Sequence, residues 1–353
     1  MTEPFDPDAA AAPGSGLFGL ESGPDESTVH VLPVPFDATT SYRRGTSLGP
    51  AAVAAASHQV DLYDRLFGRP YGAGIWLQPD DGMVAEWNDE ARGLADPIIA
   101  VGGRLGPDRE LQRGLQRVNE LGALVNEHVA TWSSERLAAG RIPIILGGDH
   151  SVPLGNMRAC AYQHPGMGML HIDAHADLRD AYEGFEWSHA SILFNARRTI
   201  PGLGSLVQVG LRDLGGREAE RISSDAEIHA VFDDDWARAR MAGEPLANRV
   251  RAAIAALPSE VYLTVDIDGL SPDHCPHTGT PVPGGLNWPE MMLWLELLVE
   301  SGRTIVGADL VEVSPGPEPD PEGTSWDAVV GARLLYRLIG AALASQDSPP
   351  GTN

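Results

Sequence analysis

The sequence contains no lysine, so all 25 of its basic residues are arginine. A chain without lysine cannot form a lysine Schiff base, anchor pyridoxal phosphate, or supply the lysine of a P-loop or of a protein kinase. Acidic residues outnumber basic ones 49 to 25, and the formal net charge is −24. Because polyanion binding requires clustered positive charge, we expect no nucleic acid partner.

Cysteine and long apolar runs are also scarce. The two cysteines, Cys160 and Cys275, match no metal-binding or redox spacing, so no disulfide framework is expected and a cytoplasmic location is predicted. The N-terminus has neither a basic start nor an apolar core, which argues against a signal peptide. No apolar run reaches the roughly 18 residues of a membrane span, so we expect no membrane association.

The composition at the two ends differs from that of the middle. Residues 1–28 are rich in proline, glycine, alanine and acidic side chains, and we expect this extension to lack fixed structure. Residues 346–353 are predicted to be a flexible tail. The intervening segment, 29–345, contains no internal repeat or long linker and is predicted to form a single domain.

Within this domain, short apolar runs alternate with longer helical patterns. Such alternation predicts an α/β fold with a mostly parallel sheet that is covered by helices on both faces. The expected strands span residues 29–34, 142–146, 167–173, 206–211, 260–267 and 304–313. The expected helices span residues 51–66, 109–139, 236–256, 289–301 and 326–344.

Polar clusters follow four of these strands and contain the candidate chemistry. Because the carboxyl ends of parallel strands meet at one edge of a sheet, we expect the clusters to converge. Residues spaced by two at a strand end point the same way, so each cluster can present its side chains together. The candidates at this edge are His150, Asp173, His175, Asp177, Asp266, Asp268 and Glu312.

Four carboxylates in one small volume would raise each other's pKa unless positive charge balances them. Two divalent cations would neutralise four negative charges, and a shared hydroxide would leave a site matched to a monocationic substrate. A mixture of carboxylate and imidazole ligands suits a first-row divalent ion such as manganese. The sequence therefore predicts a site for two metal ions.

Five motifs, in this order, resemble those of the ureohydrolase family, which includes arginases, agmatinases, guanidinobutyrases and formiminoglutamases. They are GGDHS (147–151), DAHAD (173–177), DIDGLSP (266–272), TGTPVPGG (278–285) and LVEVSPG (310–316). Residues 34–50 are also similar to the N-terminal segment of agmatinases. The resemblance extends over about residues 31–340. It implies a three-layer α/β/α sandwich with a parallel eight-stranded sheet, the arginase–deacetylase fold, and a homo-oligomer such as a trimer or hexamer.

The resemblance also implies roles for individual residues. It implies two Mn²⁺ ions per chain, for which Ni²⁺ would fit the same ligands. One ion would take His150, Asp173, Asp177 and Asp266, and the other would take Asp173, His175, Asp266 and Asp268. The matching positions make His189 the proton shuttle, with Asp268 as an alternative proton donor. Glu312 would bind the guanidinium group, and Thr280 would lie on the substrate side.

Two positions depart from the family pattern. Ser271 stands where the family usually has aspartate, which affects the geometry of a loop and none of the expected ligands. Gly215 stands where arginases carry the aspartate that binds the amino group of arginine. The loop after DAHAD also lacks the Ser/Asn-rich element of arginases. We therefore expect a substrate other than L-arginine.

Three small guanidino compounds are candidate substrates. Glu183 and Glu186 could attract the distal ammonium of agmatine, whereas Arg179 could attract the carboxylate of 4-guanidinobutanoate. Phe185 and Trp187 could instead enclose a pocket for guanidine itself. We expect an agmatine-like substrate, because the N-terminal segment resembles that of agmatinases. A formiminoglutamase is a further alternative within the family.

Two other function classes compete with a ureohydrolase. A zinc deacetylase can be built on the related fold, but it would hold one zinc ion, whereas the histidine of GGDH and the second aspartate of D-x-D favour two ions. A metal-binding pseudoenzyme is the second alternative. His189 and Glu312 weigh against it, since a protein that only holds metal needs neither.

Overall fold

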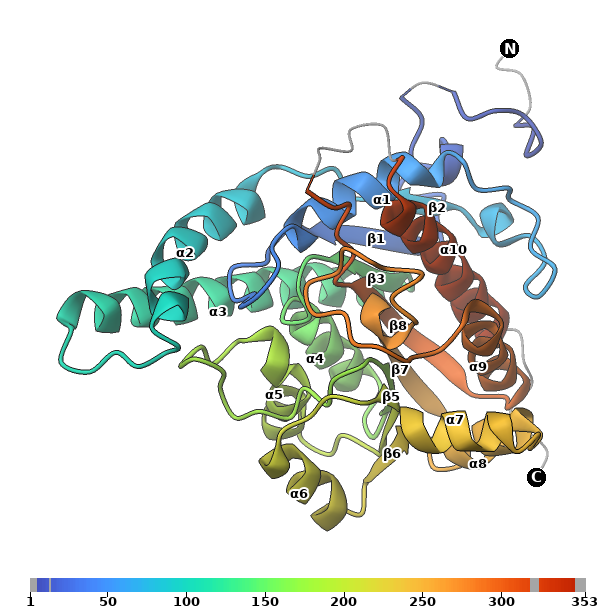
Figure 1. Ribbon diagram of the computed structural model, residues 1–353. Helices are drawn as coiled ribbons and strands as arrows, with labels where there is room; N and C mark the ends of the chain where they lie inside the picture. Colours follow the sequence, from blue (N-terminus) through green and yellow to red (C-terminus); the bar gives the residue numbers. More distant parts are fainter. Residues whose placement is uncertain (1–4, 13, 318–323, 347–353) are drawn as a thin grey trace.

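The computed structural model describes residues 5–12, 14–317 and 324–346. Its centre is one eight-stranded sheet with the strand order β2-β1-β3-β8-β7-β4-β5-β6, in which all neighbouring strands run parallel (Figure 1). The α/β sandwich fold with a parallel eight-stranded sheet is thereby confirmed. The strands are β1 (Val29–Val34), β2 (Ile75–Leu77), β3 (Ile142–Gly147), β4 (Gly168–Ile172), β5 (Leu206–Leu211), β6 (Ile228–Phe232), β7 (Glu260–Asp266) and β8 (Thr304–Val311).

The central strands are apolar throughout because both of their faces are buried. In β3, Ile142, Ile144 and Leu146 belong to the main core on one face of the sheet, whereas Ile145 packs into a second core on the other face. This alternation follows from the two-residue period of a strand. The two edge strands, β2 and β6, were not predicted: β2 has only three residues, and β6 is half-buried over most of its length.

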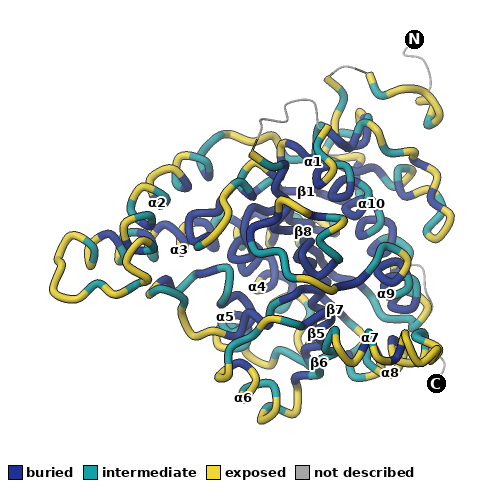
Figure 2. Tube along the Cα trace, in the orientation of Figure 1, coloured by how far each residue is buried: buried dark blue, intermediate teal, exposed yellow. Residues whose placement is uncertain are grey.

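Helices cover both faces of the sheet. The core beneath α1, α9 and α10 is the larger one, and α7 and α8 extend the same layer. Figure 2 shows the buried sheet between exposed outer helix surfaces. One layer contains α1 (Gly49–Ser57), α7 (Asp233–Met241), α8 (Leu246–Ile254), α9 (Trp288–Glu300) and α10 (Trp326–Gln346). The other contains α2 (Met83–Ala100), α3 (Arg109–Ala138), α4 (Leu154–Gln163), α5 (Ile192–Thr199) and α6 (Gly216–Ser224).

Local signals explain which helices the sequence predicted well. The helix α3 begins after Asp108, whose side chain accepts hydrogen bonds from two backbone N–H groups of the first turn. The helix α9 begins with a capping box formed by Asn287 and Glu290. The single helix expected over 236–256 is instead two helices, because Gly243 has a φ of +71° and Pro245 follows it. The helix expected over 51–66 ends at Ser57.

The N-terminal extension is more ordered than its composition suggested. Leu17, Phe18 and Leu20 are buried in the main core, and the Phe18 ring contacts Tyr336 of α10 at a centroid distance of 4.8 Å. The expected lack of structure is therefore wrong for this segment, because three apolar side chains dock onto α1 and α10. Residues 1–4 and 347–353 lie outside the described residues, and Gln346 is the last residue of α10.

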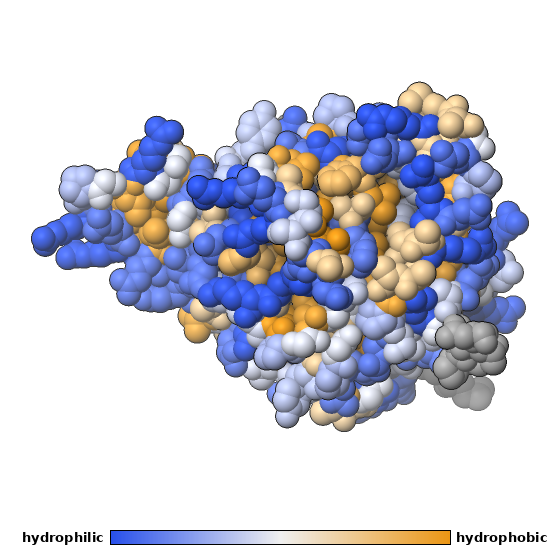
Figure 3. Space-filling model, turned by 90° about the horizontal axis from the view of Figure 1, so that it is seen from below, coloured by the Kyte–Doolittle hydropathy of each residue, from blue (hydrophilic) through white to orange (hydrophobic). Residues whose placement is uncertain are grey.

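The helix α10 is long and apolar enough to cross a membrane by length and composition alone. No membrane span was expected from the sequence, yet this helix passes that test. However, 72% of its most apolar window is buried inside the fold, as is usual for a core helix. The surface seen in Figure 3 is mainly hydrophilic, with apolar side chains in separate patches.

Candidate metal centre

The four polar clusters converge at the carboxyl edge of the sheet. Each lies directly after one of the neighbouring strands β3, β8, β7 and β4. The turn after β3 requires glycine, since a Cβ atom on Gly148 would lie 2.1 Å from the backbone oxygen of Phe36. This close approach directs the next two residues, Asp149 and His150, into the interior, where both are buried.

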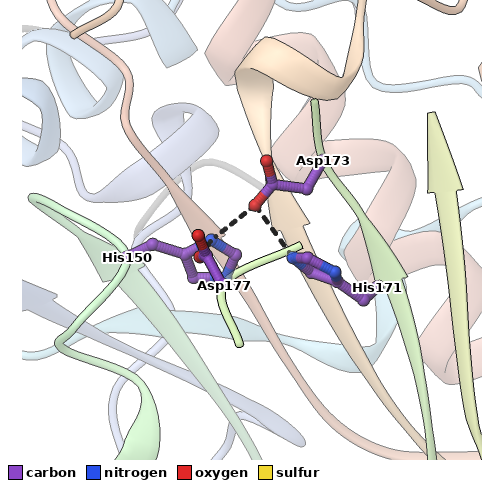
Figure 4. A group of neighbouring side chains, drawn as sticks. All are labelled: His150, His171, Asp173 and Asp177. Atoms are coloured by element: carbon purple, nitrogen blue, oxygen red, sulfur yellow. Dashed lines mark hydrogen bonds and ion pairs between the residues drawn. The ribbon is translucent and has the colours of Figure 1, made fainter. Parts of the chain in front are cut away.

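Three carboxylates surround His150. Its Nδ1 atom lies 3.0 Å from Oδ2 of Asp173, 3.3 Å from Oδ2 of Asp177 and 3.5 Å from Oδ2 of Asp266. Figure 4 shows His150 and Asp177 pointing toward Asp173 from separate segments. The backbone of Asp177 has a φ of +53°, in the left-handed region, which turns its side chain back toward the strand ends.

A second group adjoins the first through Asp173. The Nδ1 atom of His175 lies 3.3 Å from Oδ1 of Asp173 and 3.2 Å from Oδ2 of Asp268. Candidate ligand atoms of His150, His171, Asp173 and Asp177 lie within 4.8 Å of one another, and so do those of Asp173, His175 and Asp268, close enough in each case to hold a metal ion. Asp266 belongs to neither of these two sets, but it lies beside His150. The two oxygens of Asp173 thus face different groups, which is the arrangement that a bridging carboxylate needs. All six residues expected as metal ligands lie together in this region.

The electrostatics of the cluster favour added positive charge. Burial raises the pKa of Asp266 well above its usual range, and the carboxylates of Asp268 and Asp173 add to this. Burial and Asp173 raise the pKa of Asp177 to about 6. Burial alone would lower the pKa of His175, but the two neighbouring carboxylates raise it to about 12. Among the described residues, no arginine forms an ion pair with these carboxylates, so two divalent cations fit the charge and the ligand types.

One residue of the cluster, His171, was missed by the sequence analysis. Its Nε2 atom lies 2.8 Å from Oδ2 of Asp173, and its Nδ1 atom lies 3.1 Å from Nε2 of Gln208 (Figure 4). Because an amide N–H can only donate, Gln208 makes Nδ1 the acceptor and leaves Nε2–H to donate to Asp173. A signal was available in the sequence, since His171 precedes Asp173 by two positions and shares its side of β4.

A cavity of about 160 Å³ opens beside the cluster. Its walls include His189, Glu312, Thr280 and Arg179, four of the residues expected to act on substrate. Glu312 is buried with a φ of +61°, and its Oε1 atom accepts a hydrogen bond of 3.0 Å from the backbone N–H of His150. Burial raises its pKa well above the usual range. Such strain and desolvation are characteristic of functional sites.

His189 begins a short 3₁₀ turn, His189–Ser191, and also lines this cavity. Burial, with further repulsion from the charged forms of His175 and His150, lowers its pKa to about 3. The hydroxyl of Thr280 lies 3.5 Å from Oδ2 of Asp268. An imidazole, a carboxylate and a hydroxyl thus surround the space next to the cluster.

The structure separates the residues expected to select the substrate. Arg179 lines the cavity, but its guanidinium lies 3.4 Å from Glu218 and 4.6 Å from the centroid of the Tyr182 ring. Glu183 is not among the residues that line this cavity, and its backbone packs against Gly103 in the α2–α3 connection. The pairing of Glu183 with a substrate ammonium is therefore not supported by its position.

The pocket expected from Phe185 and Trp187 is also absent at this cavity. Phe185 is fully buried between α2 and α3, in a cluster with Ala95, Ile98 and Val118. Trp187 packs against α3, where a Cβ atom on Gly122 would lie 3.1 Å from it. Both aromatic residues anchor the loop that carries His189, and neither of them lines the cavity.

Comparison with known proteins gives a consistent result. Residues 27–340 match the model of the Arginase family. N(1)-aminopropylagmatine ureohydrolase of Synechocystis sp. is 31% identical over 321 residues, covering 89% of this chain and 89% of the relative. Guanidinobutyrase of Pseudomonas aeruginosa is 31% identical over 310 residues, covering 87% and 83%. The structure of proclavaminate amidino hydrolase of Streptomyces clavuligerus superposes with a TM-score of 0.68 at 22% identity, covering 96% and 99%.

Proposed function

The chain belongs to the arginase family, and we propose that it is a manganese-dependent ureohydrolase that removes urea from a small guanidino compound with an amine tail, such as agmatine. The observation that supports this function best is the pair of metal-sized groups sharing Asp173 beside a cavity that contains Glu312 and His189. The relative that acts on N(1)-aminopropylagmatine supports the amine tail.

The chain's own residues would bind and orient both the ions and the substrate. His150, Asp173, Asp177 and Asp266 would hold one ion, and Asp173, His175, Asp266 and Asp268 the other. When bound, the two ions would lower the pKa of a shared water and supply hydroxide at neutral pH. Nickel suits the same ligands as manganese, so the metal is part of the proposal.

Glu312 would bind the cationic guanidinium group through charge-assisted hydrogen bonds and fix its central carbon next to the ions. His189 would deliver a proton to the departing amine nitrogen as its bond to that carbon breaks. Asp268, which contacts Thr280, is the alternative donor. The products are urea and the free amine of the substrate tail.

The direct test measures urea release from agmatine, N(1)-aminopropylagmatine, 4-guanidinobutanoate, guanidine and arginine, with the chain loaded with Mn²⁺ or Ni²⁺. We expect the highest kcat/KM with an amine-tailed substrate and two metal ions per chain by elemental analysis. Preference for arginine would contradict the substrate assignment. One zinc ion per chain without urea release would instead favour the deacetylase alternative.

One observation favours a second candidate, a 4-guanidinobutanoate hydrolase. Arg179 is the one arginine among the residues that line the cavity, and it could pair with a carboxylate tail if it left Glu218. The similarity to guanidinobutyrase agrees with this candidate. The substitution Arg179→Met separates the two substrates, because it should impair only hydrolysis of the acidic one.

We propose further that the enzyme works in the cytoplasm as a homo-oligomer, a trimer or hexamer, and without a nucleic acid or membrane partner. The net charge of −24 and the burial of α10 support the last two points. Light scattering of the purified chain tests the oligomer, and a stable monomer would contradict it.

A further inference from the structure

His189 contacts a buried hydroxyl group that belongs to a distant part of the chain. The backbone N–H of His189 donates to Oγ1 of Thr39 at 3.3 Å, and the Nδ1 atom of the same histidine lies 3.4 Å from that oxygen. Thr39 belongs to the loop that follows β1, and only 3% of its surface is exposed. Two hydrogen-bonding groups of His189 therefore face one oxygen atom.

The hydroxyl of Thr39 is in turn oriented by a buried carboxylate. It lies 3.1 Å from Oδ2 of Asp149, which is completely buried. The backbone N–H of Ser151 donates to Oδ1 of Asp149 at 3.0 Å, and the Ser151 hydroxyl donates to the same oxygen. Three donors thus converge on Asp149, which is the environment of a hydrogen-bond acceptor.

Counting donors and acceptors assigns the protons in this chain of groups. A threonine hydroxyl has a single proton, and here the proton is given to Asp149. The same oxygen can then only accept from His189, which favours a proton on Nδ1 of the imidazole. The Ser188 hydroxyl, which accepts from the N–H of Ala190, lies slightly farther from Nδ1, at 3.5 Å. With the proton on Nδ1, the free lone pair of neutral His189 is on Nε2. His189 lines the cavity, so Nε2 is the atom left for proton exchange there.

We propose that Thr39 and Asp149 are positioning residues that fix the tautomer and orientation of His189, so that Nε2 is the atom that transfers the proton. This inference rests on the proposed function. When the C–N bond of the substrate breaks, its electron pair goes to the departing nitrogen, and Nε2 of the imidazolium gives that nitrogen a proton. The neutral His189 that remains keeps its proton on Nδ1, hydrogen-bonded to Thr39, and takes a new proton on Nε2 from solvent.

The loop does not need the Thr39 hydroxyl for its shape. Arg92 of α2 donates to the backbone oxygens of Asp37, Ala38 and Thr40 at 2.7 to 3.3 Å, and Asn88 accepts from the N–H of Asp37 at 2.8 Å. These contacts fix the backbone on both sides of Thr39. Removal of the hydroxyl should therefore affect His189 without unfolding the loop.

The test compares Thr39→Val, which removes the hydroxyl, with Thr39→Ser, which keeps it. Thr46→Val is a matched control, because Thr46 is buried in the same segment and its hydroxyl has no hydrogen-bond partner among the described residues. In Thr39→Val we expect kcat to fall about 10- to 100-fold, with KM and the metal content unchanged. Thr39→Ser and Thr46→Val should retain kcat within about threefold of the wild type.

A spectroscopic measurement tests the inference without catalysis. The chain has 11 histidines, so ¹⁵N-labelled imidazole signals of the metal-free protein can be assigned to His189 by comparison with His189→Gln. The wild type and Thr39→Ser should show the Nδ1–H tautomer, and Thr39→Val a mixture of tautomers. An unchanged tautomer in Thr39→Val, or equal kcat losses in both variants, would overturn the proposal. If no guanidino compound yields urea, the proposed function fails. The tautomer measurement would still test whether Thr39 fixes the proton on Nδ1 of His189.

Discussion

Replacement of Glu312 by glutamine separates the substrate-binding role of this residue from metal binding. The glutamine has the same shape, and its carbonyl oxygen can still accept the 3.0 Å hydrogen bond from the backbone N–H of His150. Neither of the two metal-sized groups found among the described residues includes Glu312. Only the negative charge facing the cavity is lost, so we expect the metal ions to stay bound while activity falls.

The size of the effect follows from the lost charge. A hydrogen bond to a charged group contributes about 1.5–3 kcal/mol, roughly twice the neutral value, and a guanidinium can form two with one carboxylate. Glu312→Gln should therefore weaken transition-state binding by about 2–3 kcal/mol, or about 30- to 150-fold in kcat/KM. Burial and the carboxylates of Asp266 and Asp149 raise the pKa of Glu312, so ionised Glu312 destabilises the fold. The variant should thus unfold at an equal or higher temperature without metal.

The assay combines urea release, metal analysis and thermal unfolding. Glu290→Gln is the matched control, because Glu290 is also buried but caps α9, lies 3.1 Å from Arg240, and is not among the residues that line the cavity. We expect the opposite pattern there, with lower stability and unchanged kcat/KM. Loss of both metals in Glu312→Gln, or kcat/KM within about threefold of the wild type, would refute the reasoning.

Three further predictions concern metal, packing and thiols. The pKa of His175 is raised to about 12 in the folded protein, against 6.5 in the unfolded chain. Protonation of His175 therefore stabilises the metal-free protein fully below pH 6.5 and progressively less as the pH rises above that value. Because a metal ion must displace this proton, metal affinity should rise with pH. Thermal unfolding in EDTA should show stability that falls as the pH rises, and calorimetric metal titrations should show affinity that rises. If both quantities changed with pH in the same direction, the prediction would be contradicted. Phe185→Ala should cost about 3–5 kcal/mol of unfolding free energy and lower kcat by loosening the His189 loop, whereas Phe185→Leu should cost less than about 1.5 kcal/mol in the same denaturant titration. Burial raises the pKa of the Cys160 and Cys275 thiols, so a thiol reagent should label neither until the protein is denatured, and rapid labelling of the native chain would show that the core opens.

Local patterns in the sequence were sufficient for the fold class and for the location of the metal-ligand cluster. Buried parallel strands are continuous apolar runs, and six such runs mark the six inner or longer strands of the sheet. The residues directly after a strand must lie at its carboxyl edge, so D-x-H-x-D and D-x-D could be placed near each other without any knowledge of contacts. The helices α3, α9 and α10 were predictable for the same reason, since their apolar periods, the Asp108 cap of α3 and the capping box and first-turn Pro289 of α9 are local signals.

Only the tertiary structure decided which side chains outside these motifs join the site. Thr39 contacts His189 although the two residues are 150 positions apart along the chain. Glu183 does not line the cavity, and it belongs to a loop whose Phe185 is buried between α2 and α3. Leu17 and Phe18 gain order by docking onto α1 and α10, although their neighbours have the composition of a disordered segment. The physical reason is the range of the signals: periodicity and capping act over a few residues, whereas packing and hydrogen bonds between distant segments exist only once the chain has folded.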